Sequence, residues 1–237
     1  MSPIISSVNQ SFGFATTSPK IVTNGLVLYL DAGQSTSYNG GTSWTDLSGN
    51  GNNGTLTNGP TYSDSSILFD GSDDYVRLPA SSTLGKSIYY TTSAWIRYED
   101  TGYTGWMMVC DSVNYGVGGG YMMWISSDSP ATGKLLASYD GSWRFSTIRI
   151  PPNTWTNVCI SKNNNQVSFY VNGQFDITRT YNFNSSTSST VVDIGRSPRN
   201  PNYRFNGNIS QVSIYNRALT AQEISQNYNA LRGRYGI

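Results

Sequence analysis

The side chains that could catalyse a reaction are few in this sequence of 237 residues. It contains no histidine, which excludes Ser-His-Asp and Cys-His catalysis and every metal site that needs an imidazole. Acid–base chemistry would fall to carboxylates, yet Glu99 and Glu223 are the only glutamates. Asp73 and Asp74 are adjacent, so in an extended segment they point to opposite faces. Because glycoside hydrolysis normally needs two carboxylates at a fixed separation, we expect no enzymatic activity, and a glycosidase is the less favoured alternative.

Oxygen-bearing side chains are concentrated in one glycine-rich segment, residues 44–55. Asp46, Asn50 and Asn52 are interspersed there with glycines that allow backbone carbonyls to converge. Calcium prefers such carboxylate, amide and carbonyl oxygens, so these three residues are the candidate metal ligands. The same residue types form Asx-turns and left-handed positions in tight loops without a metal. Both interpretations stay open, and calcium is the one cofactor that the sequence suggests.

Aromatic side chains suited to sugar binding are concentrated between Trp106 and Trp143. Sugar recognition uses an exposed aromatic face against the ring, with amide, carboxylate or guanidinium groups fixing the hydroxyls. Trp95 and Trp155 fall inside alternating strand patterns and are assigned to packing. Each aromatic residue of the richer region is also a candidate for the core. The predicted ligand-binding residues are Tyr115, Tyr121, Trp124, Asp140, Trp143 and Arg144.

The charged residues make up only 12% of the chain and are unevenly distributed. From residue 194 to residue 237 there are six arginines and one acidic residue, Glu223. Pairing with carboxylates elsewhere in the chain is one explanation, and docking on an acidic partner is the other. A nucleic-acid groove would need lysines and arginines clustered near a stacking platform, and the chain has only four lysines, so we expect no nucleic-acid partner.

The elements that would position these residues are mainly β-strands. From Gly25 onward, short apolar and β-branched runs recur about a dozen times with turn residues between them, which predicts an antiparallel sandwich. The pair Asn172-Gly173 lies between two such runs and predicts a type I′ hairpin. Cys110 and Cys159 lie in apolar strand-like runs and are predicted to be free thiols.

One helix is predicted, and it is at the C-terminus. Thr220 and Glu223 have the spacing of a capping box, in which each side chain bonds the backbone amide of the other residue. Ile224, Tyr228 and Leu231 follow with helical spacing and form one apolar face. Gly233 is predicted to end the helix.

The N-terminal residues 1–23 show no clear apolar period and are predicted to be an arm or anchor, followed by one domain over residues 24–237. The N-terminus has neither a basic region nor an apolar region of the kind found in secretory signals, so no signal peptide is expected. No apolar run approaches the roughly 20 residues that a membrane-spanning helix needs.

Several segments together resemble the concanavalin A-like lectin/glucanase superfamily in its laminin-G-like branch. They include GLVLYLDAG at 25–33, LFDGSDDYVRLP at 68–79, YVNG at 170–173 and FNGNISQVSIYNRALTAQEI at 205–224. The resemblance implies an all-β fold, a jelly-roll sandwich of two antiparallel sheets with one short C-terminal helix, and a role in recognition. Glucanases of the superfamily depend on an acidic strand of the type E-x-D-x-E, which this sequence lacks, so catalysis is not carried over.

The compact form of this domain is similar to domains in virion proteins of tailed phages. That similarity implies a non-enzymatic virion protein, a capsid decoration or a tail- or fibre-associated protein, assembled in the host cytoplasm. Its expected partners are other virion proteins, bound through residues 1–23 and the arginine-rich C-terminal segment, together with a host glycan and further copies of the chain in a homo-oligomer. The alternative is a host-encoded secreted carbohydrate-binding module.

Overall fold

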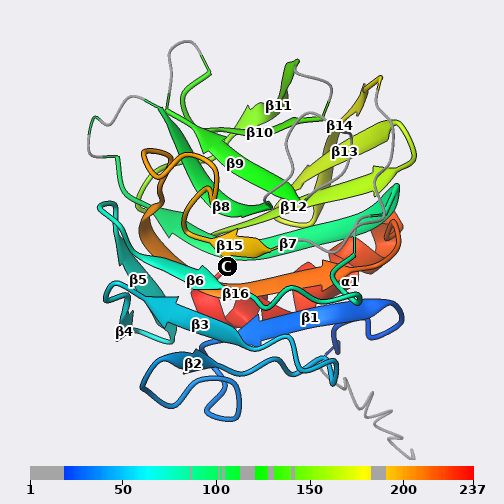
Figure 1. The fold of residues 1–237 in the computed structure, drawn as a ribbon. Coiled ribbons are helices and arrows are strands. Elements are labelled where there is room, and N and C mark those ends of the chain that lie inside the picture. Colours follow the sequence, from blue (N-terminus) through cyan, green and yellow to red (C-terminus); the bar gives the residue numbers. More distant parts are fainter. Residues whose placement is uncertain are drawn as a thin grey trace, which may run out of the picture.

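Two antiparallel sheets packed face to face form the fold in the computed structural model (Figure 1). The structure describes residues 19–85, 87–100, 102, 105–112, 121–127, 131–139, 142–182 and 191–237. In this part of the chain, one α-helix and one short 3₁₀-helix accompany the strands, and both are at the C-terminal end. The predicted all-β sandwich with a C-terminal helix is confirmed.

Sheet A comprises eight strands: β1 (Leu26–Asp31), β4 (Thr61–Ser63), β5 (Ser66–Asp70), β7 (Tyr89–Tyr98), β12 (Thr156–Asn163), β13 (Gln166–Val171), β14 (Gln174–Thr180) and β16 (Asn206–Tyr215). Their order is β14-β13-β12-β7-β16-β5-β4, and β1 also pairs with β16. Between β13 and β14, Asn172 and Gly173 have φ angles of 50° and 71°. Because a type I′ turn needs positive φ at both central positions, the predicted hairpin is confirmed.

Sheet B also comprises eight strands: β2 (Ser43–Trp44), β3 (Gly54–Thr57), β6 (Tyr75–Arg77), β8 (Trp106–Ser112), β9 (Met122–Ser126), β10 (Lys134–Ser138), β11 (Trp143–Arg149) and β15 (Val192–Ile194). Their order is β11-β10-β9-β8-β15-β6-β3-β2. The short strand β15 lies between β8 and β6, so the loop that follows it begins in the middle of this sheet.

The main hydrophobic core lies between the two sheets. Phe69, Phe169 and Ile194 are among its fully buried side chains. Cys110 lies in this core and Cys159 in a smaller cluster, and both are free thiols, as predicted. Burial raises the pKa of both thiols, so neither has the character of a reactive cysteine.

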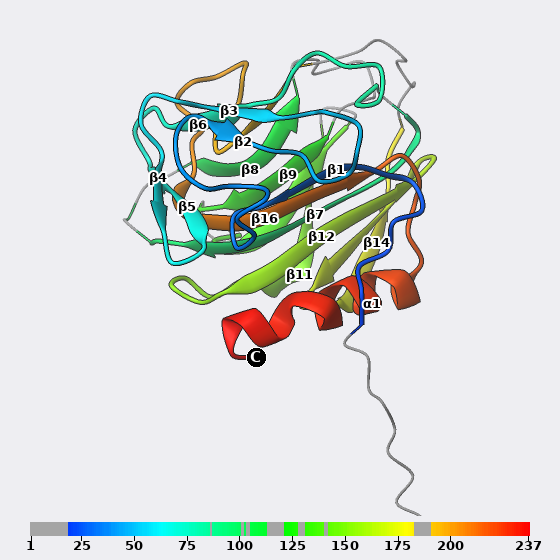
Figure 2. The same ribbon diagram turned by 90° about the horizontal axis from the view of Figure 1, so that it is seen from below.

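The C-terminal helix α1 (Ala221–Leu231) lies across the outer face of sheet A (Figure 2). Its capping box is confirmed, since Thr220 Oγ1 accepts a bond from Glu223 N at 3.2 Å and Glu223 Oε2 accepts one from Thr220 N at 2.9 Å. Ile224 of the apolar face is buried against the sheet. The helix therefore begins where the sequence predicts.

The α-helix ends at Leu231 with Arg232 as its C-cap, so Gly233 follows the cap as predicted, but its φ is not positive and it does not terminate the helical path. The chain passes from α1 directly into the 3₁₀-helix η1 (Arg232–Tyr235), and the left-handed glycine that ends it is Gly236, with φ 73°. The extra turn brings the ring of Tyr235 to a stacked position 4.0 Å from that of Trp95. Trp95 is fully buried, and Trp155 contacts Tyr235 at 5.0 Å, so both tryptophans have the packing role that was predicted.

Of the predicted N-terminal arm, residues 1–18 lie outside the described residues. The remaining part lies against α1, where Val22 N donates to Asn227 Oδ1 at 2.7 Å and Tyr215 Oη donates to Val22 O at 2.9 Å. Figure 2 shows this segment entering the fold beside the helix. No helix in the described part of the chain is long and apolar enough to cross a membrane.

Most of the C-terminal arginines are paired within the chain. Four of the six form ion pairs with carboxylates: Arg196–Asp193, Arg199–Asp111, Arg217–Glu223 and Arg234–Asp31. Three of these carboxylates have no exposed side-chain surface. Of the two explanations for the arginine-rich segment, intramolecular pairing therefore accounts for most of its charge.

Candidate functional site

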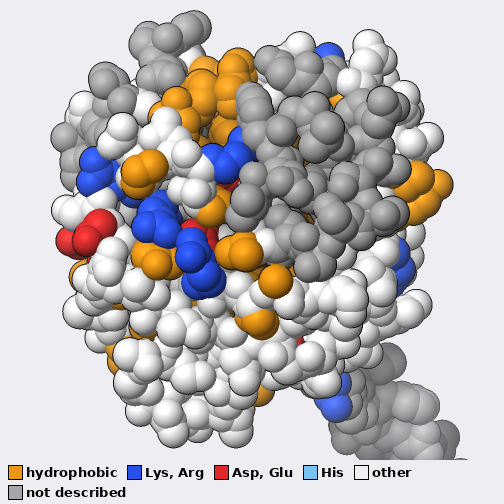
Figure 3. All heavy atoms as spheres, in the orientation of Figure 1, with side chains coloured by type: hydrophobic (Ala, Val, Ile, Leu, Met, Phe, Trp, Pro, Cys, Tyr) orange, Lys and Arg blue, Asp and Glu red, His pale blue; other side chains and the backbone are white. Residues whose placement is uncertain are grey.

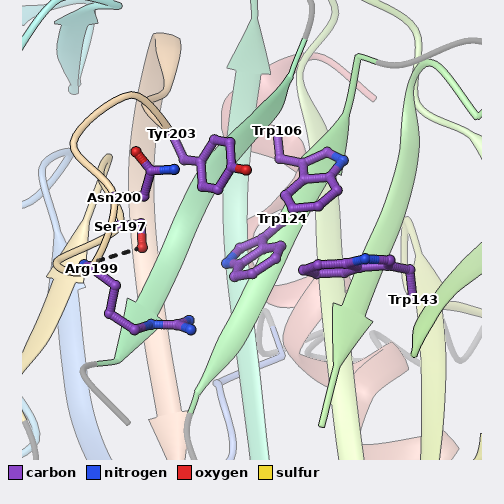
Figure 4. Close-up of a pocket in the computed structure, with 7 residues that line it drawn as sticks. All are labelled: Trp106, Trp124, Trp143, Ser197, Arg199, Asn200 and Tyr203. Carbon is purple, nitrogen blue, oxygen red and sulfur yellow. Dashed lines mark hydrogen bonds between the residues drawn. The ribbon is translucent and has the colours of Figure 1, made fainter. Parts of the chain in front are cut away.

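A pocket of about 250 Å³ lies on sheet B beneath the loop that joins β15 to β16 (Figure 4). Three strands contribute tryptophans to it and the loop contributes polar and aromatic side chains. The lining residues are Trp106, Trp124, Trp143, Ser197, Arg199, Asn200 and Tyr203.

Strand register gathers the three tryptophans on one face. Trp124 pairs with Leu136, which pairs in turn with Phe145, so these side chains share a face, and Trp143 is two residues from Phe145. Trp106 reaches the same face from β8, and its ring lies 5.7 Å from that of Trp124. The tryptophans are far apart in sequence, and only the pairing of β8, β9, β10 and β11 brings them together.

This face of sheet B points away from sheet A. Tyr121, immediately before β9, packs edge-on against Tyr90 of sheet A with the ring centres 4.9 Å apart. Trp124 is three residues further on, and alternation along an extended strand places it on the opposite face. The pocket therefore lies on the outer side of the sandwich. Figure 2 shows α1 on the opposite side of the molecule from strands β8 and β9, so the pocket and the helix lie on opposite faces.

The three indoles form a continuous apolar surface. The ring of Trp143 lies 4.0 Å from Trp106 and 5.2 Å from Trp124, and Tyr203 extends the surface at 5.0 Å from Trp106. Trp124 is 2% exposed and forms the floor, whereas Trp106 and Trp143 are half-buried and form the wall. Such a surface can pack against one face of a ring-shaped ligand.

The loop over the pocket is held by its own backbone bonds. Ser197 N donates to Tyr203 O and Tyr203 N donates to Asn200 O, both at 2.9 Å. Asn200 Oδ1 accepts from Asn202 N at 3.1 Å, which leaves the amide nitrogen directed toward the ring of Tyr203 (Figure 4). The loop therefore presents a side-chain amide and a guanidinium beside the aromatic surface, in positions fixed before any ligand arrives.

A buried carboxylate fixes the position of the guanidinium. Nη2 of Arg199 lies 3.0 Å and 3.1 Å from the two carboxylate oxygens of Asp111, and Ser197 Oγ donates to the same carboxylate at 2.7 Å. Burial raises the pKa of Asp111 to about 6, against the opposing attraction of Arg199. At neutral pH the carboxylate is therefore ionised, and it holds Arg199 5.9 Å from the ring of Trp124.

Two of the six predicted ligand-binding residues, Trp124 and Trp143, lie in this pocket. Tyr115 and Asp140 lie outside the described residues. The structure places the remaining two, Tyr121 and Arg144, elsewhere.

Tyr121 is buried between the sheets, which corrects the expectation that its face is open to a ligand. Arg144 lies 4.4 Å from the ring of Tyr181, which is fully buried. Being next to Trp143 on β11, Arg144 points to the opposite face. The two residues lie apart from the pocket for one reason, since the predicted set mixes the two faces of neighbouring strands.

Five lining residues were not predicted: Trp106, Ser197, Arg199, Asn200 and Tyr203. Trp106 lies at the edge of the aromatic region from Trp106 to Trp143. The register between β8 and β9 places it on the same face as Trp124, and the sequence does not reveal that register. For the loop residues, the only signal was a polar, proline-containing segment between two strands, which does not specify which face it covers.

The candidate calcium loop has its polar side chains directed at the chain itself. Asp46 Oδ1 accepts from Tyr29 N and Ser48 N, and Oδ2 accepts from Ser48 Oγ and Asn52 N, at 2.8–3.0 Å. The amide nitrogens of Asn50 and Asn52 donate to the carbonyls of Leu26 and Val27. The bond from Ser48 N to Asp46 Oδ1 is that of an Asx-turn, and the others tie the loop to β1 and to its own backbone. Calcium binding stays a prediction.

A second group of carboxylates, Asp70, Asp73 and Asp74, has oxygens within 4.8 Å of one another. Asp74 Oδ2 accepts from Asp70 N at 3.0 Å and Asp70 Oδ1 accepts from Ser72 N at 2.7 Å. Desolvation raises the pKa of Asp74. These bonds close a tight turn between β5 and β6.

Known structures share this fold at low sequence identity. Domain 4 of AbnA, an extracellular arabinanase from Geobacillus stearothermophilus solved with arabinotriose, superposes with a TM-score of 0.65 at 21% identity, over 86% of this chain and 98% of that one. A Trypanosoma rangeli sialidase superposes with a TM-score of 0.67 at 16% identity, over 89% of this chain and 33% of the sialidase. The binding domain of Paraclostridial Mosquitocidal Protein 1 superposes with a TM-score of 0.67 at 18% identity, over 88% of this chain and 52% of that one.

These likenesses establish a lectin-like jelly-roll fold. No curated protein sequence matches the chain. Residues 70–225 match the laminin-G-like family described as the concanavalin A-like lectin/glucanases superfamily, and this match extends from β5 to the first turn of α1. The chain therefore belongs to the concanavalin A-like lectin/glucanase superfamily.

Proposed function

We propose that this chain is a non-enzymatic carbohydrate-binding domain and that the ligand binds in the tryptophan pocket. The observation that carries the proposal is that three indoles line one pocket together with the side chains of Arg199 and Asn200. Aromatic faces pack against the C–H side of a sugar ring, while amide and guanidinium groups bond its hydroxyls. The arabinanase domain with the same fold was solved with a bound trisaccharide, which supports this class of ligand.

Binding without hydrolysis is the proposal because the residues that the structure describes in the pocket provide no pair of carboxylates. None of the described lining residues is acidic. The carboxylate that two lining residues contact, that of Asp111, is fully buried and is engaged by Arg199 and Ser197. Glycosidases need one carboxylic acid and one carboxylate flanking the scissile bond, both with access to the substrate.

The test compares two half-buried tryptophans on opposite sides of the molecule. Trp143→Ala removes one wall of the pocket, and Trp155→Ala, on the side of η1, is the matched control. On a glycan array followed by calorimetry, wild type and Trp155→Ala should bind the same oligosaccharides. Trp143→Ala should lose about tenfold or more in affinity, as expected for a stacking contact worth about 1–2 kcal/mol. Equal binding by both variants, or release of reducing sugar by the wild type, would refute the proposal.

For the setting of this domain we propose a virion surface, with the pocket facing outward. In support, residues 20–22 bond to α1 on the outer face of sheet A, whereas the pocket opens on the outer face of sheet B. An attachment at one face would leave the other free for a glycan. Deletion of residues 2–18 should preserve folding and glycan binding but abolish co-sedimentation with phage particles. Failure of the full-length chain to co-sediment would favour the alternative, a secreted carbohydrate-binding module.

A further inference from the structure

We infer that the pocket and the arginines beside it recognise a glycan that carries an acidic group, a carboxylate or a sulfate. The arginine row is defined as Arg77, Arg196 and Arg199. This inference rests on the proposed function, to which it adds the chemical class of the ligand.

Strand register places the arginine row next to the pocket. Asp111 on β8 pairs with Asp193 on β15, which pairs with Arg77 on β6, so the three lie side by side across sheet B. Asp111 also pairs with Met122, which shares a face with Trp124 by alternation. Because neighbouring strands are about 4.8 Å apart, the row extends about 10 Å from the edge of the pocket.

The arginines of the row are partly exposed, whereas the carboxylates beneath them are buried. The side chains of Arg77, Arg196 and Arg199 are 43%, 17% and 21% exposed, whereas those of Asp111 and Asp193 are both 0% exposed. Three cations thus lie over two buried anions, and the surface that a ligand meets is positive. Figure 3 shows Lys and Arg side chains gathered in the middle of this face, beside hydrophobic ones.

The guanidinium groups are held in place yet keep donors for a ligand. Arg77 bonds Asp193 through Nε and Nη2 at 2.9 Å and 2.8 Å, and Arg196 bonds the same residue through Nη2 at 3.3 Å. The guanidinium of Arg196 also stacks 3.5 Å from the ring of Tyr75. Among the described residues, neither Arg77 nor Arg196 donates a hydrogen bond through Nη1. Fixed, planar donors of this kind suit a carboxylate or sulfate oxygen.

The proximity of the pocket favours an acidic glycan over an acidic protein. Arg199 belongs to both features, since it lines the pocket and completes the row. A pocket of about 250 Å³ with tryptophan walls accommodates a ring, and the next residues of an oligosaccharide would lie over the row. A protein partner would use the charged row without needing the indoles.

The experiment uses the full chain and pairs of oligosaccharides that differ only in charge. Each acidic probe, such as tetragalacturonate or a sulfated chondroitin tetrasaccharide, is compared with its carboxyl-reduced or desulfated form, and polyglutamate tests for an acidic protein. We expect the acidic member to bind about tenfold more tightly at low salt, and the difference to shrink in 0.5 M NaCl because salt screens exposed charges. The carboxylate and sulfate probes show which acidic group is preferred.

Substitutions then locate the effect. Arg77→Gln and Arg196→Gln should each reduce the preference for the acidic member about threefold or more, with neutral binding unchanged. Arg232→Gln, an exposed arginine of η1 on the other side of the molecule, is the control and should change neither. The salt titration of the wild type needs no variant, so the test holds even if a substitution impairs folding.

The outcomes separate the two proposals. Equal binding of both members of each pair, lost in Trp143→Ala, would overturn the acidic preference and leave the proposed function standing. Binding of none of the glycans would refute both. An acidic preference that survives Arg77→Gln and Arg196→Gln, or tight polyglutamate binding that is unaffected by Trp143→Ala, would overturn the inference as well.

Discussion

Arg199 and Asp111 connect the loop of the pocket to the sheet below it. One nitrogen of the guanidinium, Nη2, is within 3.1 Å of both carboxylate oxygens, and Ser197 of the same loop donates to one of them. Asp111 has no exposed side-chain surface, whereas Arg199 is 21% exposed at the rim. The position of the loop therefore depends on the charge of a carboxylate that no ligand touches.

The first prediction is that ligand affinity falls as the pH is lowered from 7.5 to 5. Burial raises the pKa of Asp111 to about 6, so protonation in this range removes the negative charge that holds Arg199. A neutral oligosaccharide is used, because its own charge does not change. Calorimetry should show the decrease in wild type, whereas Asp111→Asn should bind weakly at every pH.

Protonation of Asp111 affects the stability of the folded protein in the opposite direction to its effect on ligand binding. A carboxyl whose pKa is raised by folding stabilises the folded state fully below its unfolded value near 3.8, and this contribution is lost as the pH rises through about 6. Acidification should therefore weaken binding without a loss of stability from this group. A fall in binding that merely follows a fall in the melting temperature would contradict the prediction.

The second prediction concerns Asp46, whose oxygens accept four hydrogen bonds within residues 29–52. Removing a buried carboxylate with several bonds leaves donors unsatisfied, so Asp46→Ala should cost about 2–4 kcal/mol of unfolding free energy in the presence of a chelator. Chemical denaturation measures this cost. Ser63→Ala, on the exposed strand β4, is a control that should leave the midpoint unchanged.

The same measurements decide the calcium interpretation. If the loop binds calcium, the wild type gains about 2.7 kcal/mol when the free ion is a hundredfold above its dissociation constant, and Asp46→Ala abolishes the gain. Identical denaturation curves in calcium and in chelator would leave the Asx-turn as the sole role of the loop.

The local features of the fold could be predicted because each depends on a few neighbouring residues. The positive φ angles at Asn172 and Gly173 follow from their residue types, and the capping box needs only Thr220 and Glu223. The local pattern misses only the 3₁₀ turn that follows the α-helix. The additional turn is held by stacking of Tyr235 on Trp95, a contact between residues far apart in sequence that no local pattern contains.

The site could be predicted only in part because it is assembled from distant segments. Trp124 and Trp143 belong to an aromatic region that composition alone makes visible, but alternation does not say which face of a strand is outermost. Composition alone therefore groups Tyr121 with Trp124, although the two side chains point in opposite directions. Ser197 is 86 residues from its partner Asp111, and only the placement of β15 beside β8 brings them together.

The third prediction is that Glu223→Ala destabilises the domain by about 1–2 kcal/mol. Glu223 completes the capping box and also receives two bonds from Arg217, at 2.9 Å and 2.6 Å. The bonds from Arg217 lower the pKa of Glu223 to about 2, so its contribution is present above pH 4.5 and is lost as the pH falls toward 2. Thermal melts of wild type and variant should therefore converge at low pH. A constant difference down to pH 2 would contradict this account.

The fourth prediction concerns Lys162, whose side chain is fully buried. It lies on β12, and its Nζ is 5.6 Å from the ring centre of Tyr90 and 5.9 Å from that of Tyr139. Desolvation lowers the pKa of Lys162 to about 7, far below its ordinary value of 10.5. Between these two values the unfolded chain holds a proton that the folded chain has released.

Stability therefore rises with pH over this window, since the contribution of a group with a lowered pKa is complete above 10.5 and is lost as the pH falls to about 7. The slope approaches about 1.4 kcal/mol per pH unit for one proton. The comparison stops at pH 9.5, because Tyr90 has a pKa raised well above 10 and opposes the trend in more alkaline solution.

Lys162→Met should be more stable than wild type at pH 7, and the difference in unfolding free energy between the two proteins should narrow as the pH rises. Lys134→Met, at a partly exposed position on β10, should instead run parallel to wild type. A gap between wild type and Lys162→Met that stays constant from pH 7 to 9.5 would show that Lys162 is charged in the folded protein throughout this range.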